Sequence, residues 1–453
     1  ICHVCGKSGH NAGFNGSVYV DCLDRPCYLC KRSGHTTQTC PFRIPPTTAS
    51  AQASSSGVVR ALQQRRLAMP PPGSGPLSCR EYRPLVEYAC KFPTRWAIDL
   101  GLLRRHTRRV TALLFLKQYP HILISTDKAG AMSVLDITNP DTSSGLSNPH
   151  RWLITGLTPD PLSPGSVLTC AVDGTLKRSG VETEFREELS NLNPGGWTGD
   201  HKNWRSFYSV GASGHQVFGG DDIGRVHMID TRADGNTAMH TLHKKNKVTC
   251  IDFNPVADQY VLTCGNDHFM TLWDARNWKE CIGKLDHKKV VNSAYFSPHT
   301  GTRIVSTCID NRLRVWDSMH QAIMEPSREI VHSHDFARYL SPFKAVFSPR
   351  DHLERRVVLG RYISESFHGK KLHPVDVLNV DGKTTNPLAA QLVHPFMSTI
   401  SPVNVFHPTL DIVASGSSGS LFLWKPTTRQ IITDGVLEED DSDTNGDDDD
   451  DDG

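Results

Sequence analysis

Between about residues 108 and 426, the sequence repeats a unit that ends in Trp-Asp or a close variant. Trp273 and Trp316 end two such units and lie about 43 residues apart, within the ~40–45-residue period of one common repeat class. Each unit contains short runs of alternating apolar and polar residues, broken by turn pairs such as Asn-Pro, Ser-Pro, Asp-Asn and Ser-Gly. This pattern predicts consecutive antiparallel strands. Because one unit is too small to bury its own apolar face, neighbouring units must pack on each other.

A repeat of this length that ends in Trp-Asp is typical of WD40 blades. Seven units are present, of which the second, at about 152–181, is the weakest and the sixth carries an insertion. We therefore predict an all-β fold with a seven-bladed WD40 β-propeller over residues 93–430. No apolar run approaches the ~18–20 residues of a membrane helix, so no membrane partner is expected.

The composition divides the rest of the chain into four further segments. Residues 1–44 are rich in Cys, His and Gly, and residues 45–56 are predicted to form a flexible linker. Residues 57–92 are predicted to form a helix-loop-helix segment, and residues 431–453 an acidic disordered tail. Because the linker separates the first segment from the propeller, we expect the propeller to fold independently of any metal bound there.

The net charge of +1 conceals an uneven charge distribution. The last 16 residues contain 2 Glu and 9 Asp, which leaves 49 basic against 37 acidic residues, or +12, in the rest of the chain. A basic body with an acidic tail indicates a polyanionic partner. The alternative is that the tail is only a solubilising end.

Six of the thirteen cysteines lie in the first 40 residues. The others are scattered without a disulfide-like framework, which favours a reducing compartment and a metal site for the cluster. Cys27, Cys30, His35 and Cys40 have the compact spacing of a zinc knuckle, in which a short loop presents two thiolates and Gly34 allows a tight turn before the histidine. Such a short stretch folds only with its metal.

A second set begins in the same way with Cys2, Cys5 and His10, but the next cysteine is Cys22. We predict a stretched knuckle with Cys22 as the fourth zinc ligand. Knuckles often bind single-stranded nucleic acid, for which Tyr28, Lys31 and Arg32 are suitable, but they also serve as protein contacts. The spacing does not separate these two roles.

The predicted helix at 57–69 carries an apolar stripe, and prolines follow it directly. Its stripe includes Val58, Leu62 and Leu67. Because two short helices cannot form their own core, they must dock on another surface. One unit ends in Trp273-Asp274-Ala275-Arg276, and this ending resembles the one that marks adaptor docking in WD40 receptors of cullin ligases.

Several short motifs, in the same order and in the same units, resemble the small subunit of the UV-damaged-DNA-binding complex. They are SSGVVRALQQRRL, RRVTALLF, HKKNKVTCIDFNP, GGDDIGRVHMID and FARYLSPFKAVFSPR with LGRY. The resemblance covers about residues 56–426, and the knuckle extension is similar to that of plant-type members. It implies recognition of UV lesions in duplex DNA in the nucleus, nucleotide excision repair, and binding of the large subunit, which connects to a cullin–RING ubiquitin ligase. Histones or nucleosomes are a further candidate partner.

The resemblance also implies site residues. A hairpin that enters the minor groove while two bases leave the stack would correspond to Phe336, Ala337, Arg338 and Tyr339, with either Phe336 or Tyr339 as the wedge. The stretch departs from the aromatic–Gln–His pattern of animal members. Phosphate contacts would correspond to Arg108, Arg109, Lys128, Lys244, Lys245 and Lys247. Trp204 and Tyr362 match aromatic residues near the lesion pocket, although Trp204 would also suit a blade core.

Two other functions remain open. The chain could be a protein-binding WD40 receptor of a cullin ligase whose hairpin grips a degron, or an RNA-processing scaffold that uses its knuckles. Propellers are mostly interaction platforms, and no nucleophile elbow, Walker loop or paired-carboxylate motif stands in its expected context. We therefore do not expect an enzyme.

Overall fold

The computed structural model describes most of the chain, and within these residues it contains strands but no helix. The described residues are 2–15, 18–22, 24–44, 96–140, 147–183, 185–197, 203–232, 237–317, 325–335, 341–367, 369–382 and 386–427. The predicted linker, the helix-loop-helix segment and the acidic tail lie outside this part, and so do Val58, Leu62 and Leu67. No helix of the described residues is long and apolar enough to cross a membrane.

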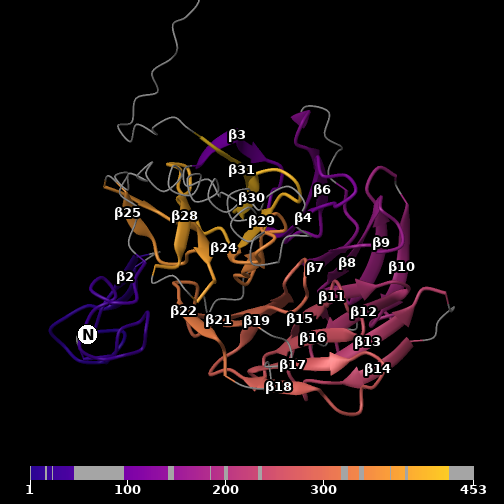
Figure 1. Ribbon diagram of the computed structural model, residues 1–453, viewed down its shortest axis with the longest axis horizontal. Coiled ribbons are helices and arrows are strands. Elements are labelled where there is room, and N and C mark those ends of the chain that lie inside the picture. The colour runs from indigo at the N-terminus through magenta and orange to yellow at the C-terminus, as the bar shows by residue number, and fades with distance from the viewer. Residues whose placement is uncertain are drawn as a thin grey trace, which may run out of the picture.

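Seven antiparallel sheets form the blades of a β-propeller, which confirms the predicted fold (Figure 1). The first strands of neighbouring blades contact each other and therefore lie innermost. Blades one to three contain β4 (Val110–Phe115), β5 (Ile122–Asp127), β6 (Met132–Asp136); β7 (Ile154–Pro159), β8 (Ser166–Ala171), β9 (Thr175–Gly180), β10 (Arg186–Asn191); and β11 (Phe207–Ser213), β12 (Gln216–Asp221), β13 (Arg225–Asp230), β14 (Thr237–Thr241). The second unit, weak in sequence, is thus a complete four-stranded blade.

Blades four and five follow the same pattern. They contain β15 (Val248–Phe253), β16 (Tyr260–Gly265), β17 (Phe269–Asp274), β18 (Gly283–Asp286); and β19 (Val291–Phe296), β20 (Ile304–Cys308), β21 (Arg312–Trp316), β22 (Arg328–Val331). Blade six contains β23 (Val346–Phe347), β24 (Arg356–Gly360), β27 (Val375–Asn379) and β28 (Leu388–Leu392). The insertion predicted in this unit forms a separate hairpin of β25 (Glu365–Phe367) and β26 (Lys370–Leu372).

Blade seven closes the ring with strands from both ends of the propeller sequence. It contains β29 (Val403–Phe406), β30 (Val413–Ser417), β31 (Ser420–Pro426) and, as its outermost strand, β3 (Trp96–Arg104). The register pairs Trp96 with Pro426 and Arg104 with Ser420. Because this one sheet combines strands from both ends of the propeller sequence, its backbone hydrogen bonds hold the ring closed.

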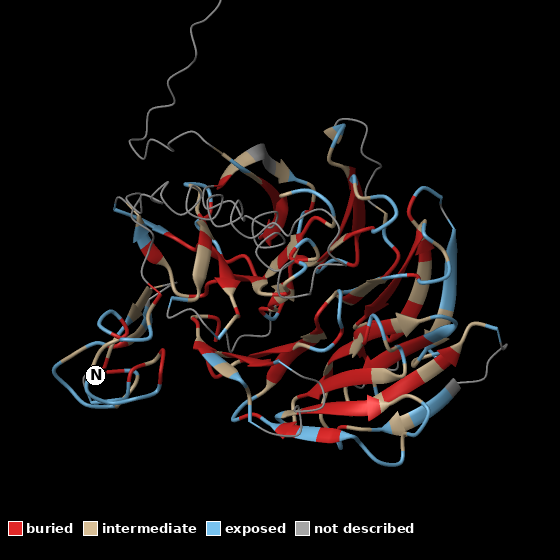
Figure 2. Ribbon diagram, viewed as in Figure 1, coloured by how far each residue is buried: buried red, intermediate tan, exposed pale blue. Residues whose placement is uncertain are grey.

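Alternating apolar residues pack between the blades, as Figure 2 shows by the red interior strands. Strand β5 is buried along its whole length, whereas the outer strand β10 is largely exposed. In several blades, buried polar side chains form hydrogen bonds with one another. In blade four, His243 contacts Asp267 through Nδ1 at 2.9 Å and Thr263 through Nε2 at 2.9 Å, and the Thr263 hydroxyl accepts the Trp273 indole N–H. The terminal tryptophan of the repeat therefore completes a buried network.

The two faces of the propeller carry different turns. Because strands alternate in direction within a blade, each innermost strand begins on the face where the second strand ends. We call this the front face; it also carries the connections between blades. The opposite, back face carries the turns that follow the first and third strands. The hairpin β25–β26 joins the second and third strands of blade six and so belongs to the front face.

Candidate functional site

Two Cys/His modules precede the propeller, and both are formed by the same local turn. In the first module, residues 2–22, the Cys2 amide donates to the Lys7 carbonyl at 2.8 Å. In the second module, residues 24–44, the Cys27 amide donates to the Arg32 carbonyl, also at 2.8 Å. Each turn folds its two cysteines toward one point, as tetrahedral metal coordination requires.

The insertion that stretches the first module is a small hairpin. Strands β1 (Gly13–Asn15) and β2 (Val18–Val20) pair between His10 and Cys22 and return the chain to the cluster. Ahead of the histidine in the second module, Gly34 has a φ of +93°, as its predicted role requires. The structure therefore brings Cys22 to its expected partners across a longer loop.

The ligand atoms of each module lie within 4.8 Å of one another. The groups are Cys2, Cys5, His10 and Cys22, and Cys27, Cys30, His35 and Cys40. His10 Nε2 lies 3.3 Å from the Cys22 sulfur, and His35 Nε2 lies 3.0 Å from the Cys30 sulfur. Burial raises the pKa of the Cys40 thiol to about 12, so this group loses its proton at neutral pH only if a cation is bound. Three thiols and an imidazole suit a soft or borderline metal ion.

The second module docks on the front face, where blades five and six meet (Figure 1). The Tyr28 hydroxyl donates a hydrogen bond to the Asp335 carbonyl oxygen at 3.1 Å. The Asn311 side-chain amide donates to the Tyr28 carbonyl at 3.3 Å. Leu29 packs with the ligand cysteines and Val331 in one apolar cluster. The predicted linker at 45–56 follows the second module and lies outside the described residues. The module itself is in direct contact with the propeller.

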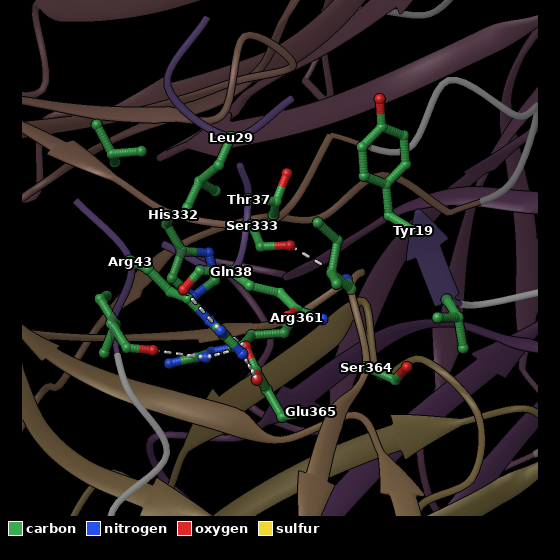
Figure 3. Close-up of a pocket in the computed structure, with 14 residues that line it drawn as sticks. Tyr19, Leu29, Thr37, Gln38, Arg43, His332, Ser333, Arg361, Ser364 and Glu365 are labelled. Carbon is green, nitrogen blue, oxygen red and sulfur yellow. Dashed lines mark hydrogen bonds and ion pairs between the residues drawn. The ribbon is translucent and has the colours of Figure 1, made fainter. Parts of the chain in front are cut away.

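A second set of contacts surrounds a small cavity between the module and blade six (Figure 3). Arg43 forms an ion pair with Glu365. Arg361 donates from Nη1 to the Ile44 carbonyl at 3.0 Å and from Nε to Asp376 at 2.5 Å. Opposite charges therefore balance in this interface, and each buried charge has a partner.

Four aromatic rings join both modules to the propeller. Phe14 lies 5.0 Å from Tyr362, 4.9 Å from Tyr19 and 5.3 Å from Tyr28, measured between ring centroids. Tyr362 is buried, with 8% of its surface exposed, whereas Phe14 is 37% exposed. The ring expected near a lesion pocket is thus covered in this structure by a ring from the first module.

The predicted phosphate-contacting residues that the structure describes all lie on the front face. Arg108 and Arg109 precede β4, and the Lys128 amide after β5 donates to the Arg109 carbonyl at 3.0 Å. Burial lowers the pKa of Arg109. Its Nη1 atom is buried and makes no hydrogen bond to any described residue. Arg109 as a whole is half-buried on this face.

Three lysines precede β15 on the same face. Lys244 and Lys245 are exposed, and the Lys247 ammonium lies over the Tyr208 ring, 4.2 Å from its centroid. Burial and, to a lesser extent, Lys344 lower the pKa of Lys247. These residues come from a different blade than Arg109, so the propeller brings them to the same side of the ring.

Trp204 lies on the front face, before β11, and is half-buried. Its indole N–H donates to the Val172 carbonyl at 2.9 Å, so it is held by blade two rather than buried in a blade core. Trp152 and Trp197 lie beside it at centroid distances of 5.1 and 5.4 Å and are both exposed. These two tryptophans lie in loops outside the repeat pattern, so the pattern does not reveal them.

The hairpin residues expected to recognise damage, Phe336, Ala337, Arg338 and Tyr339, lie outside the described residues. Their flanks are described: Asp335 is buried, and the Ser341 hydroxyl donates to the Val110 carbonyl at 3.4 Å. The chain therefore enters this segment from blade five and leaves it beside blade one's inner strand, on the front face.

Arg276 lies on the back face, after β17. Its Nε and Nη2 atoms bind both oxygens of Asp274 at 2.9 and 2.7 Å. Arg232, after β13, binds Asp230 at 3.0 and 2.7 Å in the same way. Sequence analysis missed this residue, although the same Asp-x-Arg spacing without the tryptophan would have revealed it. The candidate docking arginines are thus on the face opposite the phosphate-contacting candidates.

The comparisons with known proteins agree with this architecture. Residues 236–274 and 279–317 match the family described as WD domain, G-beta repeat. DNA damage-binding protein 2 of rice is 38% identical over 448 residues, which are 96% of this chain and 73% of that protein. Protein DAMAGED DNA-BINDING 2 of Arabidopsis thaliana is 37% identical over 435 residues, 94% of this chain and 75% of that protein. DNA damage-binding protein 2 of Gallus gallus is 32% identical over 260 residues, which are 56% of this chain and 49% of that protein.

The fold and the two Cys/His modules define a WD40 propeller of the kind that acts as a binding platform, with an N-terminal extension that could bind metal ions. Within that class, the rice and Arabidopsis proteins match nearly the whole chain. The chain belongs to the DNA damage-binding protein 2 family. This confirms the family resemblance found in the sequence.

Proposed function

We propose that this chain is a non-catalytic, nuclear protein that recognises UV-damaged duplex DNA with its front face. The supporting observation is the collection of cations on that face: Arg108, Arg109 and Lys128 at the ends of the blade-one strands, and Lys244, Lys245 and Lys247 ahead of β15. The names of its relatives state DNA-damage binding. Phosphate contacts from several blades would position the duplex without reading its sequence.

In this proposal the residues Phe336, Arg338 and Tyr339 enter the minor groove where a lesion has weakened pairing. Unstacking a base step costs a few kcal/mol, and least where damage has already disturbed it. Inserted side chains therefore select for damage rather than for sequence. Trp204, with its exposed neighbours Trp152 and Trp197, offers ring faces for stacking on the same side of the propeller.

The two modules are proposed to bind structural zinc. Each offers three cysteines and one histidine, a ligand set that is common in structural zinc sites. The metal would supply the folding energy of each module and no chemistry. On the back face, Arg276 and Arg232 are proposed to contact the large subunit of the damage-binding complex together with the 57–92 segment, and thereby a cullin–RING ligase. The chain could then bind DNA and adaptor at once, since the two surfaces face opposite directions.

A gel-shift assay with irradiated and intact duplex, in excess competitor, tests the central claim. The full chain should retard irradiated duplex selectively. Replacing Phe336, Arg338 and Tyr339 together by Ala should abolish the preference but leave weak binding to intact duplex and its salt dependence unchanged. If this triple variant keeps the wild-type ratio of damaged to intact affinity, the segment does not recognise damage. A preference for RNA, or capture of a protein degron without any DNA preference, would instead favour the scaffold or the receptor alternative.

A further inference from the structure

We propose that the second module is a positioning element for damage recognition: it holds Asp335, so that metal occupancy at Cys27, Cys30, His35 and Cys40 controls discrimination between damaged and intact DNA. This inference rests on the proposed function, in which the 336–340 segment recognises damage. It adds a role for the module that is neither a direct nucleic-acid contact nor an independent appendage.

The first step links the metal ligands to Tyr28. Tyr28 follows the ligand Cys27 directly and precedes the ligand Cys30 by two residues. The Lys31 amide donates to the Cys27 carbonyl at 2.8 Å, which closes the turn that contains Tyr28. A bound metal would therefore fix the backbone of Tyr28, because both ends of this short turn would be coordinated.

The second step links Tyr28 to the backbone ahead of the recognition segment. The Tyr28 hydroxyl binds the Asp335 carbonyl, and the Asn311 side chain binds the Tyr28 carbonyl. The oxygen of the same Asn311 side chain accepts the amides of His334 at 3.1 Å and Asp335 at 2.7 Å. One buried asparagine thus ties the module to the two residues that precede position 336.

Charge strengthens the same contact. The Asp335 carboxylate is buried and lies 3.9 Å from the Lys31 ammonium and 3.7 Å from that of Lys289. Burial raises the pKa of Asp335, while the two lysines oppose this shift. Lys31 belongs to the module and Lys289 to the connection between blades four and five, so a cation from each partner holds this carboxylate.

The two flanks of the 336–340 segment are held in different ways. The far flank, at Ser341, is fixed to the propeller itself through Val110. The near flank, at Asp335, is held by the propeller and the module together. Inserted side chains must be held within a fraction of an ångström to act on a base step. A looser near flank should therefore weaken binding at lesions, whereas phosphate contacts from the blades should persist.

A pair of conservative variants of the full chain tests this inference. Tyr28→Phe removes the hydroxyl that binds Asp335, and Tyr19→Phe removes a hydroxyl from the neighbouring ring, 4.5 Å away, that makes no hydrogen bond among the described residues. Both keep all eight ligand residues, and metal analysis should show wild-type metal content in each. The hydrogen-exchange rates of the His334 and Asp335 amides, measured without DNA, show how firmly the backbone ahead of residue 336 is held.

We expect Tyr28→Phe to raise exchange at these two amides and to lower the damaged-to-intact affinity ratio roughly two- to tenfold, as for the loss of one neutral hydrogen bond. Tyr19→Phe should match the wild type, and removal of the metal by a chelator should exceed the effect of Tyr28→Phe. Intact-DNA affinity and its salt slope should stay constant throughout. An equal loss for damaged and intact DNA, or unchanged exchange at both amides after chelation, would overturn the inference.

The same measurements separate failure of this inference from failure of the proposed function. If the wild-type chain shows no preference for irradiated duplex, the proposed function is wrong, and the claim about discrimination is overturned with it. If the wild type prefers damage but Tyr28→Phe and the metal-free chain keep the full ratio, only the positioning role is overturned.

Discussion

The hydroxyl of Tyr28 donates a hydrogen bond to the carbonyl oxygen of Asp335, although 307 positions separate the two residues in the sequence. This contact connects the second Cys/His module to the junction of blades five and six. It means that the module is part of the propeller's front face. The predicted linker at 45–56 lies outside the described residues, but Ile44, just before it, packs in a core cluster with residues of blades five and six.

The first prediction concerns metal content. The full chain, purified without chelator, should contain two metal ions per molecule, and zinc is the expected element. Cys27→Ser with His35→Ala should remove one ion, and Cys5→Ser with His10→Ala the other, because each pair belongs to one ligand group. Elemental analysis by mass spectrometry gives the count. The main thermal transition should shift little, because the blade cores contain none of these ligands; absence of metal from the wild type would contradict the prediction.

The second prediction concerns the back face. Arg276→Ala and Arg232→Ala should each weaken capture of the large adaptor subunit, and polar substitutions at Val58 and Leu62 should add to the loss. Both arginine side chains are mostly exposed, so their ion pairs are screened by solvent and the stability of the fold should change little. Pull-down with the adaptor measures the effect.

A suitable control is Arg350→Ala, which breaks another ion pair, with Asp411, on the same face. It should leave adaptor capture unchanged. If the two Asp-x-Arg variants and the Val58 and Leu62 changes also leave it unchanged, the adaptor binds elsewhere.

The third prediction concerns phosphate contacts. Lys247→Ala should weaken binding of damaged and intact duplex alike and reduce the salt slope by about one, because one released counterion is lost. Lys284→Ala is the matched control: its ammonium also lies over a ring, Phe269 at 3.6 Å, but on an outer strand rather than on the front face. Titrations at several salt concentrations distinguish the two. A loss confined to damaged DNA would place Lys247 with the damage-recognising residues instead.

The fourth prediction concerns acid stability. Burial raises the pKa of Asp173, but hydrogen bonds from His150 and Thr175 outweigh it and leave this pKa well below its usual range. The folded chain then binds fewer protons than the unfolded chain as pH falls through the usual Asp range near ~3.9. The stabilisation is therefore complete near neutral pH and is lost progressively as the pH falls from about 5 toward the lowered pKa of the folded state.

Thermal denaturation between pH 7 and about pH 2 measures this effect. Asp173→Asn should cost about 1–3 kcal/mol at pH 7, because a buried histidine loses its charged partner. It should also flatten the fall in melting temperature toward the acid end of this range. A variant with the same pH profile as the wild type would show that this carboxylate does not contribute to the pH dependence. Asp136→Asn, at an exposed turn, provides the comparison.

Much of the fold could be predicted because its signals are local. Trp273 and Trp316 mark equivalent ends of consecutive blades, and the turns between them fall at regular intervals. The ligand groups could be predicted for the same reason, since cysteines two residues apart must share a turn. Cys22 was the least certain ligand, and only the β1–β2 hairpin explains how it reaches Cys2.

The candidate site could be predicted only in part. Arg109, Lys128 and Lys247 were named from a resemblance, and their location on one face follows from the common direction of the inner strands. Arg232 was missed because its unit ends without tryptophan. The cover over Tyr362 could not be foreseen, because no sequence pattern relates Phe14 to a residue in blade six.

The amino-acid sequence alone determined the number and order of the blades, the presence of two Cys/His ligand sets and the family. These properties depend on periodicity and short spacing, which act between near neighbours in the chain. Only the tertiary structure decided that the second module lies on the front face beside Asp335, and that Tyr362 is covered. Such contacts depend on shape and charge complementarity between surfaces that exist only after each part has folded.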